Sequence, residues 1–316
     1  MFNNSESRFW RSQVLNSNNN ENQGSRAKRG VLILGFLASF NILAWVGVWQ
    51  LNQPHLEVTF FDVGQGDAIF IETTEHQQIL IDGGPSGQKV LEKLGKEMPF
   101  WDRTIDLIVL THPERDHMAG LLEVLKRYRV QNILWTGVVR DTSEYREWQK
   151  LIEVEGANIY IAYAGLQISG EQFSADPRRT VLRILYPFES LEGKEVKDSN
   201  NTSIILRLVY GEISFLFTGD ATQSVERQLL KRDKPSINAD VLKVGHHGSK
   251  TSTVQEFVEA VSPETAVISL GKDNSYGHPH QATLDTLAKY GISILRTDIS
   301  GDIKIFSDGN NLNFKY

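Results

Sequence analysis

The pattern of apolar and polar residues divides the chain into three parts. Residues 1–29 are rich in Asn, Ser, Gln and Arg and show no sustained apolar periodicity, which predicts a disordered basic tail. Residues 31–51 carry no charge, and a helix rising about 1.5 Å per residue over this stretch spans a hydrocarbon core of roughly 30 Å. Residues 30–51 are therefore predicted to be one N-terminal transmembrane helix, and residues 55–316 to be a folded domain.

From residue 56 onward, apolar runs of strand length alternate with amphipathic stretches of helix length. We expect strands over residues 56–61, 68–73, 78–82, 106–111, 157–164, 203–210, 213–219, 240–245, 265–271, 292–297 and 302–306. Helices are expected over residues 88–97, 117–128, 143–154, 221–232, 253–260 and 281–290. The early strands follow one another through short turns and the later ones alternate with helices, which predicts an α/β domain.

The charge distribution gives the apolar segment an orientation. Arg26, Lys28 and Arg29 stand just before it, whereas the first Lys or Arg after it is Lys89. Because positively charged flanks stay in the cytoplasm, we expect a single-pass membrane protein with a cytoplasmic tail and an extracytoplasmic domain. Residues 1–54 carry a net charge of +3 and the remainder −9. A long non-specific groove for nucleic acid is normally basic, so this balance argues against such a groove.

The sequence contains no cysteine, so any metal ion must be held by His, Asp and Glu. The strongest candidate run is His112-Pro113-Glu114-Arg115-Asp116-His117, which follows an expected strand and opens an expected helix. Open α/β sheets usually bind ligands at such a strand end, and four potential ligands so close together suit divalent ions. The alternative is an ordinary helix start, but no capping box supports it.

Three weaker signals follow. Asp220, after Thr218-Gly219, is either a ligand or a helix cap. His246 and His247 end another expected strand, and because neighbours in extended chain face opposite sides, only one of them is expected to reach a given metal. His278 lies in the loop Tyr276-Gly277-His278-Pro279-His280. Two isolated histidines, His55 and His76, are expected to be merely solvated.

Taken together, these motifs resemble the metallo-β-lactamase superfamily over residues 56–316. The resemblance is carried by Phe61-Asp62-Val63-Gly64-Gln65-Gly66-Asp67-Ala68, Ile81-Asp82-Gly83-Gly84, the His112–His117 run, Thr218-Gly219-Asp220 and Lys243-Val244-Gly245-His246-His247-Gly248-Ser249. Three motifs are similar to those in the C-terminal hydrolase domain of ComEC-type competence (DNA-uptake) proteins: Asp62–Ala68 (DVGQGDA), His246–Ser249 (HHGS) and Tyr276–His280 (YGHPH). The resemblance implies a four-layer αββα sandwich with a metal site along one edge of its two sheets.

The resemblance also implies roles for individual residues. The metal ligands would be His112 and Glu114 for a first ion, Asp116 and His117 for a second, Asp220 as the bridge and His247 as the last ligand. Catalytic roles fall to Asp116, His246 and His278, with His246 as a fallback ligand or a phosphate contact. Asp82 would orient the loop that carries the ligands, without binding the metal itself.

The chain departs from the family pattern in two places. Glu114 stands where a histidine is usual, and no histidine occurs from Met118 to Gly219. Such an oxygen-rich set of ligands favours manganese over zinc. Alternatively, one of the two metal sites is only partly occupied. We therefore expect one or two divalent metal ions, Mn or Zn, as cofactors.

The Gly64-Gln65-Gly66 turn is not a nucleotide-binding loop. No Lys-Ser or Lys-Thr follows its glycines, and no helix is expected directly after it. We interpret it as a tight crossing of the chain near the metal edge.

The leading functional hypothesis is a membrane-anchored, metal-dependent phosphodiesterase or nuclease acting on DNA. Expected partners are the lipid bilayer through residues 31–51, single-stranded DNA and a separate DNA-uptake channel protein. One alternative is a small-molecule hydrolase acting on a lactone, a thioester or a choline-phosphate headgroup. Another is a metal-depleted module that binds DNA or a protein partner at the membrane.

Overall fold

The computed structural model describes residues 31–45, 55–169, 179–233 and 237–316. The chain divides into two compact units, Met1–Gln53 and Pro54–Tyr316. In the first unit, residues 31–45 form a helix. No helix in these four stretches is both long enough and apolar enough to cross a membrane. The predicted tail and the rest of the predicted transmembrane helix lie outside the described residues.

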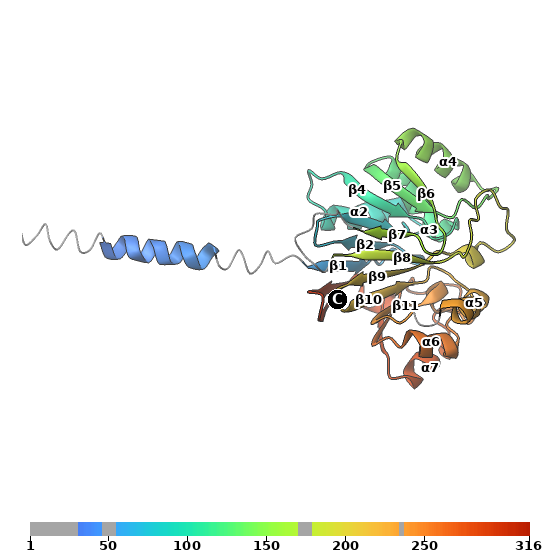
Figure 1. Ribbon diagram of the computed structural model, residues 1–316. Coiled ribbons are helices and arrows are strands. Elements are labelled where there is room, and N and C mark those ends of the chain that lie inside the picture. The colour runs from blue at the N-terminus through green and yellow to red at the C-terminus, as the bar shows by residue number, and fades with distance from the viewer. Residues whose placement is uncertain (1–30, 46–54, 170–178, 234–236) are drawn as a thin grey trace, which may run out of the picture. The chain divides into compact units, whose positions relative to one another are not determined.

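The second unit is built on two sheets, which stack face to face (Figure 1). The eight-stranded sheet has the order β15-β14-β1-β2-β3-β4-β5-β6 and the seven-stranded sheet the order β13-β12-β11-β10-β9-β8-β7. The first consists of β15 (Leu312–Lys315), β14 (Ile303–Ser307), β1 (Leu56–Phe60), β2 (Ile69–Glu72), β3 (Gln78–Ile81), β4 (Thr104–Val109), β5 (Arg129–Trp135) and β6 (Asn158–Ile161). The second consists of β13 (Ser293–Arg296), β12 (Thr265–Ile268), β11 (Val241–Lys243), β10 (Ile213–Phe217), β9 (Ile205–Tyr210), β8 (Val181–Tyr186) and β7 (Gln167–Ser169).

Helices cover the outer faces of both sheets (Figure 1). The longer ones are α2 (Gly87–Glu97), α3 (Arg115–Leu125), α4 (Ser143–Glu155), α5 (Gln223–Asp233), α6 (Gln255–Val261) and α7 (Gln281–Lys289), with a short α8 (Thr297–Ser300). Helices α2, α3 and α4 pack apolar side chains on the eight-stranded sheet. Helices α5, α6 and α7 do the same on the seven-stranded sheet. The structure therefore confirms the expected α/β sandwich of two sheets.

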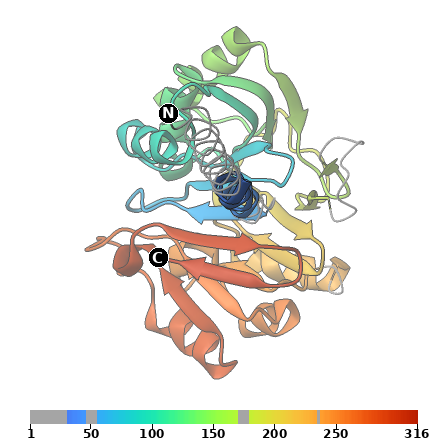
Figure 2. The same ribbon diagram turned by 90° about the vertical axis from the view of Figure 1, so that its left-hand side faces the viewer.

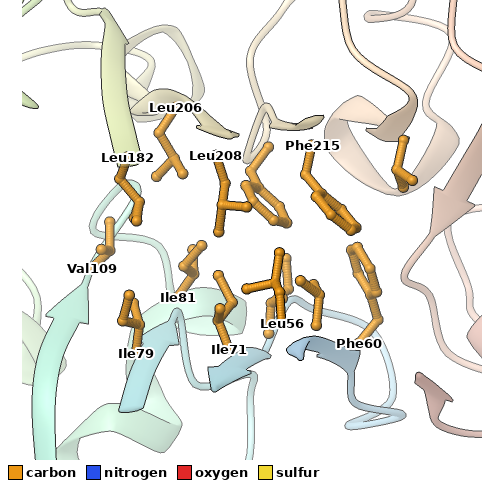
Figure 3. Packing of buried hydrophobic residues seen from close by; sticks show 14 of the residues in the cluster. Leu56, Phe60, Ile71, Ile79, Ile81, Val109, Leu182, Leu206, Leu208 and Phe215 are labelled. Carbon is orange, nitrogen blue, oxygen red and sulfur yellow. The ribbon is translucent and has the colours of Figure 1, made fainter. Parts of the chain in front are cut away.

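The main core lies between the two sheets (Figure 3). Alternate residues of each strand point inward, so that Ile79 and Ile81 of β3 meet Leu206 and Leu208 of β9 across the interface (Figure 3). Full burial of each such aliphatic side chain contributes about 1.5–3 kcal/mol. This burial holds the sheets in one register, and it fixes the shared edge at which their loops meet.

Local signals explain most element boundaries. Helix α2 is capped at its N-terminus by Ser86, whose side chain accepts a hydrogen bond from the backbone N–H of Lys89. Helix α4 is capped in the same way by Thr142, and Gly156, in the left-handed conformation, caps its C-terminus. All eleven expected strands and all six expected helices of this unit are confirmed, with boundaries shifted by up to three residues.

Four strands were not predicted from the sequence. They are β5, β7, β8 and the C-terminal β15. The C-terminal strand completes a hairpin with β14, which pairs with β1 from the other end of the domain (Figure 2). Strand β5 begins with polar residues and follows α3 closely, so its sequence shows no break between helix and strand. Pairing with β4 and β6 makes it a strand.

Parallel pairing brings several strand ends to one edge of the sandwich. Strands β3 and β4 are parallel neighbours in one sheet, and β10, β11 and β12 are parallel neighbours in the other. Their carboxyl ends carry Asp82, the His112–His117 run, Asp220 and the His246-His247 pair. Motifs that lie far apart in the chain thereby meet at one place.

Candidate metal centre

The core of the site is a group of four side chains. One ligand atom each from Asp116, His117, Asp220 and His247 lies within 4.8 Å of the others. His117 Nε2 is 3.3 Å from Asp220 Oδ1, and His247 Nε2 is 3.4 Å from Asp116 Oδ2 and 3.5 Å from Asp220 Oδ2. These are four of the six predicted metal ligands.

Unsatisfied polar atoms show that this group suits a metal ion. The Nε2 atoms of His117 and His247 and Oδ1 of Asp220 are buried and have no hydrogen-bond partner among the described residues. Leaving such atoms unpaired costs free energy. Two imidazole nitrogens and carboxylate oxygens facing one point are the donor set of a site for a divalent transition ion.

The Nδ1 atoms of His117 and His247, on the side of each ring opposite Nε2, lie close to hydrogen-bond acceptors. His117 Nδ1 lies 2.7 Å from Asp82 Oδ2, and His247 Nδ1 lies 2.8 Å from the carbonyl oxygen of Ser269. Asp82 also accepts hydrogen bonds from the backbone and hydroxyl of Thr111, at 2.8 and 2.6 Å. An Nδ1–H donated to these acceptors leaves each Nε2 lone pair free for a metal. Asp82 thus contacts the ligand loop as expected.

Two predicted ligands, His112 and Glu114, do not belong to the group of four. The His112 ring centroid is 4.2 Å from that of His117, and its buried Nε2 has no hydrogen-bond partner among the described residues. Glu114 instead accepts hydrogen bonds from Arg140 Nη2, at 2.7 Å, and from the Ser199 hydroxyl. The structure therefore brings His112 beside the group but engages Glu114 with Arg140.

Electrostatics in the group favour a cation. Burial alone disfavours a charged imidazole, but the carboxylates of Asp220 and Asp82 raise the pKa of His117 well above its ordinary value. Burial likewise opposes ionisation of Asp220, yet His247 and His117 hold its pKa well below the usual range. The ionised carboxylates thus stabilise positive charge at this point, where a divalent ion would exchange with protons.

The HHGS motif folds into an unusual turn. His246 and His247, in the 3-10 turn Gly245–Gly248, have φ angles of 48° and 54°. The left-handed region costs a non-glycine residue about 1–3 kcal/mol, and such strain is concentrated at functional sites. The turn sends the two rings in different directions. His247 is buried in the group of four, whereas His246 remains partly exposed.

His246, His278 and Asn200 line the outer side of the group. His246 Nε2 is 3.7 Å from Asp220 Oδ2 and 3.4 Å from Asn200 Nδ2. The His278 ring centroid lies 5.7 Å from that of His246. Burial, with the neighbouring His247, lowers the pKa of His278 to about 4. Burial also lowers the pKa of His246. Both rings are therefore neutral at pH 7.

Two buried residues beside the group received no role in the sequence analysis. Asp67 is paired with Lys243, and both are 1% exposed. A signal for Lys243 was present in the sequence, because a lysine inside the apolar strand Val241-Leu242-Lys243-Val244 needs a buried acidic partner. The two solitary histidines lie elsewhere: His76 is next to Glu72, and the ring of His55 contacts Phe306.

Comparison with known proteins agrees with this geometry. Residues 61–272 match the metallo-beta-lactamase superfamily. The chain is 35% identical over 267 residues to ComE operon protein 3 of Bacillus subtilis (strain 168), covering 78% of this chain and 32% of that protein. It is 32% identical over 247 residues to competence protein ComA of Neisseria gonorrhoeae, with the same shares.

The chain thus spans about a third of the length of these curated relatives. Among solved structures, Igni18, a metallo hydrolase from the archaeon Ignicoccus hospitalis, matches with a TM-score of 0.49 at 14% identity, over 78% of this chain and 98% of that one. The matches to the superfamily and to competence proteins confirm the resemblance inferred from the sequence motifs.

Proposed function

The chain belongs to the metallo-β-lactamase superfamily of metal-dependent hydrolases, and from this premise we propose that it is a phosphodiesterase that cleaves DNA. The name of one relative, competence protein ComA of Neisseria gonorrhoeae, supports a nucleic-acid substrate. The proposal includes manganese as the preferred ion, since the site is rich in carboxylate oxygens.

The observation that carries the proposal is the buried group of Asp116, His117, Asp220 and His247, with its unpaired ligand atoms. A divalent ion held there supplies Lewis-acid polarisation of a phosphoryl oxygen and lowers the pKa of water. Asp116 is the member with the greatest solvent access, its side chain being 37% exposed. Its carboxylate is therefore placed to orient an attacking water.

The outer residues supply contacts to the phosphate. A neutral His246, bonded through Nδ1 to the Thr251 hydroxyl at 3.1 Å, turns its Nε2 edge toward Asp220. Together with the Asn200 amide, this edge can bind a non-bridging phosphate oxygen and stabilise charge that develops there. His278 stands at the same mouth, where a neutral imidazole can accept a proton from an attacking water or donate an N–H hydrogen bond to a leaving oxygen.

The acidic charge of the domain restricts the type of substrate complex. A net charge of −9 after residue 54 does not favour a broad groove for duplex DNA. Two exposed basic residues are close in sequence to the site: Lys250, near His247, and Arg115, which is next to Asp116 and lies 3.7 Å from Glu144. We therefore propose a single strand, contacted over few phosphates, as the substrate.

Hydrolysis assays on the purified full-length chain test this function. We expect cleavage of bis-p-nitrophenyl phosphate and of single-stranded DNA, loss of both activities after chelation, and best recovery with Mn²⁺. An Asp220→Asn protein purified in parallel controls for contaminating nuclease. Undiminished hydrolysis after verified metal removal would refute metal dependence, and a metal-loaded protein without phosphodiesterase activity would refute the substrate class.

We also propose that residues 31–51 anchor the protein in a bilayer, with the catalytic domain outside the cytoplasm and a separate channel protein as a partner in DNA uptake. The proposal rests on the uncharged sequence of this segment and the basic residues before it. We expect the chain to resist carbonate extraction and a reporter fused after Tyr316 to be accessible to protease in intact cells. Carbonate release, or protection until lysis, would contradict the anchor or its orientation respectively.

A further inference from the structure

A buried ion pair lies directly behind the metal-binding group. Lys243, the last residue of β11, pairs through Nζ with Asp67 Oδ2 and donates a hydrogen bond to the carbonyl oxygen of Gly219 at 3.0 Å. The side chain of Lys243 is wholly buried and that of Asp67 is 2% exposed. Burying two charges carries a desolvation cost that a purely apolar pair would avoid. The position of the pair therefore calls for an explanation.

Asp67 lies on the Nδ1 side of both histidine ligands, His117 and His247. Its Oδ1 lies 3.5 Å from His247 Nδ1, and its Oδ2 lies 3.8 Å from His117 Nδ1. These nitrogens are on the opposite side of each ring from the Nε2 atoms that face Asp220. A carboxylate in this position favours the orientation in which both Nε2 atoms point toward one metal ion.

Lys243 contacts the remaining side of the group. Its Nζ lies 3.9 Å from Asp220 Oδ1, and its hydrogen bond to Gly219 holds the residue directly before Asp220. The Asp67–Lys243 pair thus touches three of the four members of the group, two through Asp67 and one through Lys243. It connects the loop between β1 and β2, which carries Asp67, with β11 of the second sheet, which carries Lys243.

The Gly64–Gly66 turn explains how Asp67 reaches this place. Gly66 has a φ of 147°, and a Cβ there would overlap the backbone carbonyl oxygen of Asp116 and come within 2.8 Å of Pro85. The turn therefore packs directly against the backbone of a ligand residue, which only glycine permits. The residue after it, Asp67, is delivered behind His117 as a consequence.

The ammonium group of Lys243 also lies at a second cluster of potential metal ligands, formed by Asp67, Asp82 and His117. Potential ligand atoms of Asp67, Asp82 and His117 lie within 4.8 Å of one another. The ammonium group of Lys243 already binds Asp67, and His117 Nδ1 already faces Asp82. The ammonium group thereby offsets the charge of Asp67 in this cluster, and the group of four remains available to the divalent ion.

We propose that the Asp67–Lys243 pair is a positioning device: a fixed internal cation and its counterion that aim His117, His247 and Asp220 at the metal. The inference rests on the proposed metal centre, and concerns residues that hold its ligands rather than the ligands themselves. Removal of either charge alone breaks this short pair and leaves the other charge buried among the ligands, Asp67 beside the two histidines or Lys243 beside Asp220.

The test is a double-mutant cycle on the full-length chain, read out as Mn²⁺ affinity by chelator competition. Asp67→Asn and Lys243→Met should each weaken Mn²⁺ binding by about 10–100-fold, the usual cost of losing a group that orients a ligand. The double variant, in which no unpaired charge remains, should weaken binding by less than the product of the two single effects. The absorption spectrum of the Co²⁺-loaded protein should change in both single variants.

Lys304→Met is the matched control. Lys304 pairs with Glu57 at 2.8 Å and with Glu97, on strands and a helix away from the metal edge. The Lys304→Met substitution should lower thermal stability without changing Mn²⁺ affinity or the Co²⁺ spectrum. If Asp67→Asn does not fold, Asp67→Glu takes its place: it keeps the charge but shifts it by one methylene, and should still weaken Mn²⁺ binding.

Single variants that bind Mn²⁺ as tightly as the wild type, or more tightly, and differ only in thermal stability would overturn the inference. Strictly multiplicative effects in the double variant would do so as well. If the wild-type chain binds no divalent ion, the proposed metal centre itself fails, which distinguishes that outcome from failure of the positioning role.

Discussion

The inner and outer sides of the metal centre differ in burial and in hydrogen bonding. The inner side comprises Asp67, Asp82, His117, Lys243 and His247, all fully or almost fully buried. The outer side comprises Glu114, Arg140, Asn200, His246 and His278, all partly exposed. Inner residues are held by short contacts to one another and to segments at the strand ends, whereas outer residues contact side chains of the surrounding loops and turns.

This difference separates two tasks. A metal site needs rigid ligands at fixed distances, which buried strand ends provide. Substrate contacts need access to solvent, which loops at the mouth provide. We therefore expect inner substitutions to act on metal binding and outer substitutions to act on turnover.

The largest effect should come from Asp220, the residue that faces both histidine ligands. Asp220→Ala removes a buried carboxylate that faces the ion, so the loss of metal affinity should exceed the roughly 10–100-fold typical of residues behind the ligands. Activity should fall below detection. Metal content beside kcat, with folding checked by circular dichroism, measures this. A folded variant with full metal and near-normal turnover would place the centre elsewhere.

The two adjacent histidines test the division most directly. His247→Ala should lose metal, because its Nε2 belongs to the group of four. His246→Ala should retain metal and lose about 100-fold in kcat, the scale of one lost contact to a developing negative charge. His76→Ala, at an exposed turn, is the control. Equal loss of metal in both variants would remove the distinction between inner and outer sides.

A third prediction concerns Glu226 of α5, which supports the loop after the HHGS motif. Its carboxylate accepts hydrogen bonds from the backbone N–H groups of Thr253, at 2.5 Å, and Val254, at 2.9 Å. Burial raises the pKa of Glu226 from 4.5 to about 7. Between these values the folded state keeps a proton that the unfolded state has lost.

Stability should therefore fall as pH rises from about 4.5 to about 7, by up to roughly 3 kcal/mol for this group. Glu226→Gln should flatten that part of the profile, and it should also lose one of the two backbone hydrogen bonds, because its amide offers a single acceptor oxygen. Denaturant unfolding of the metal-free chain at several pH values measures the slope. An unchanged slope in the variant would assign the pH dependence to other groups.

The smallest effect is expected at Glu114. Because this carboxylate is paired with Arg140 and is 34% exposed, Glu114→Gln should change stability by no more than about 1 kcal/mol and leave the number of bound ions unchanged. Arg140→Gln should behave alike, since it breaks the same pair. Loss of one ion per chain on Glu114→Gln would instead identify Glu114 as a ligand of a first metal, as its place in the motif predicts.

Much of the architecture was determined by local sequence. Short apolar runs such as Gln78–Ile81 and capped amphipathic stretches such as Gly87–Glu97 specify strands and helices from local sequence. The ligand motifs were also recognisable locally, since His and Asp side chains gathered after apolar strands have few structural uses. Local patterns thus indicated an α/β domain and the main candidate metal ligands, and the resemblance to the family implied the sandwich.

Tertiary structure decided what depends on contacts between distant segments. Strand β5 exists because β4 and β6 pair with it, and Glu114 meets Arg140 because separate loops converge. The φ angles of the HHGS turn assign His247 to the inside and His246 to the outside, a choice that alternation along an extended chain left open. The pairing of Asp67 with Lys243 joins the loop between β1 and β2 to β11 of the second sheet. No local pattern encodes such a contact, because its energy arises only when the sheets pack and exclude water.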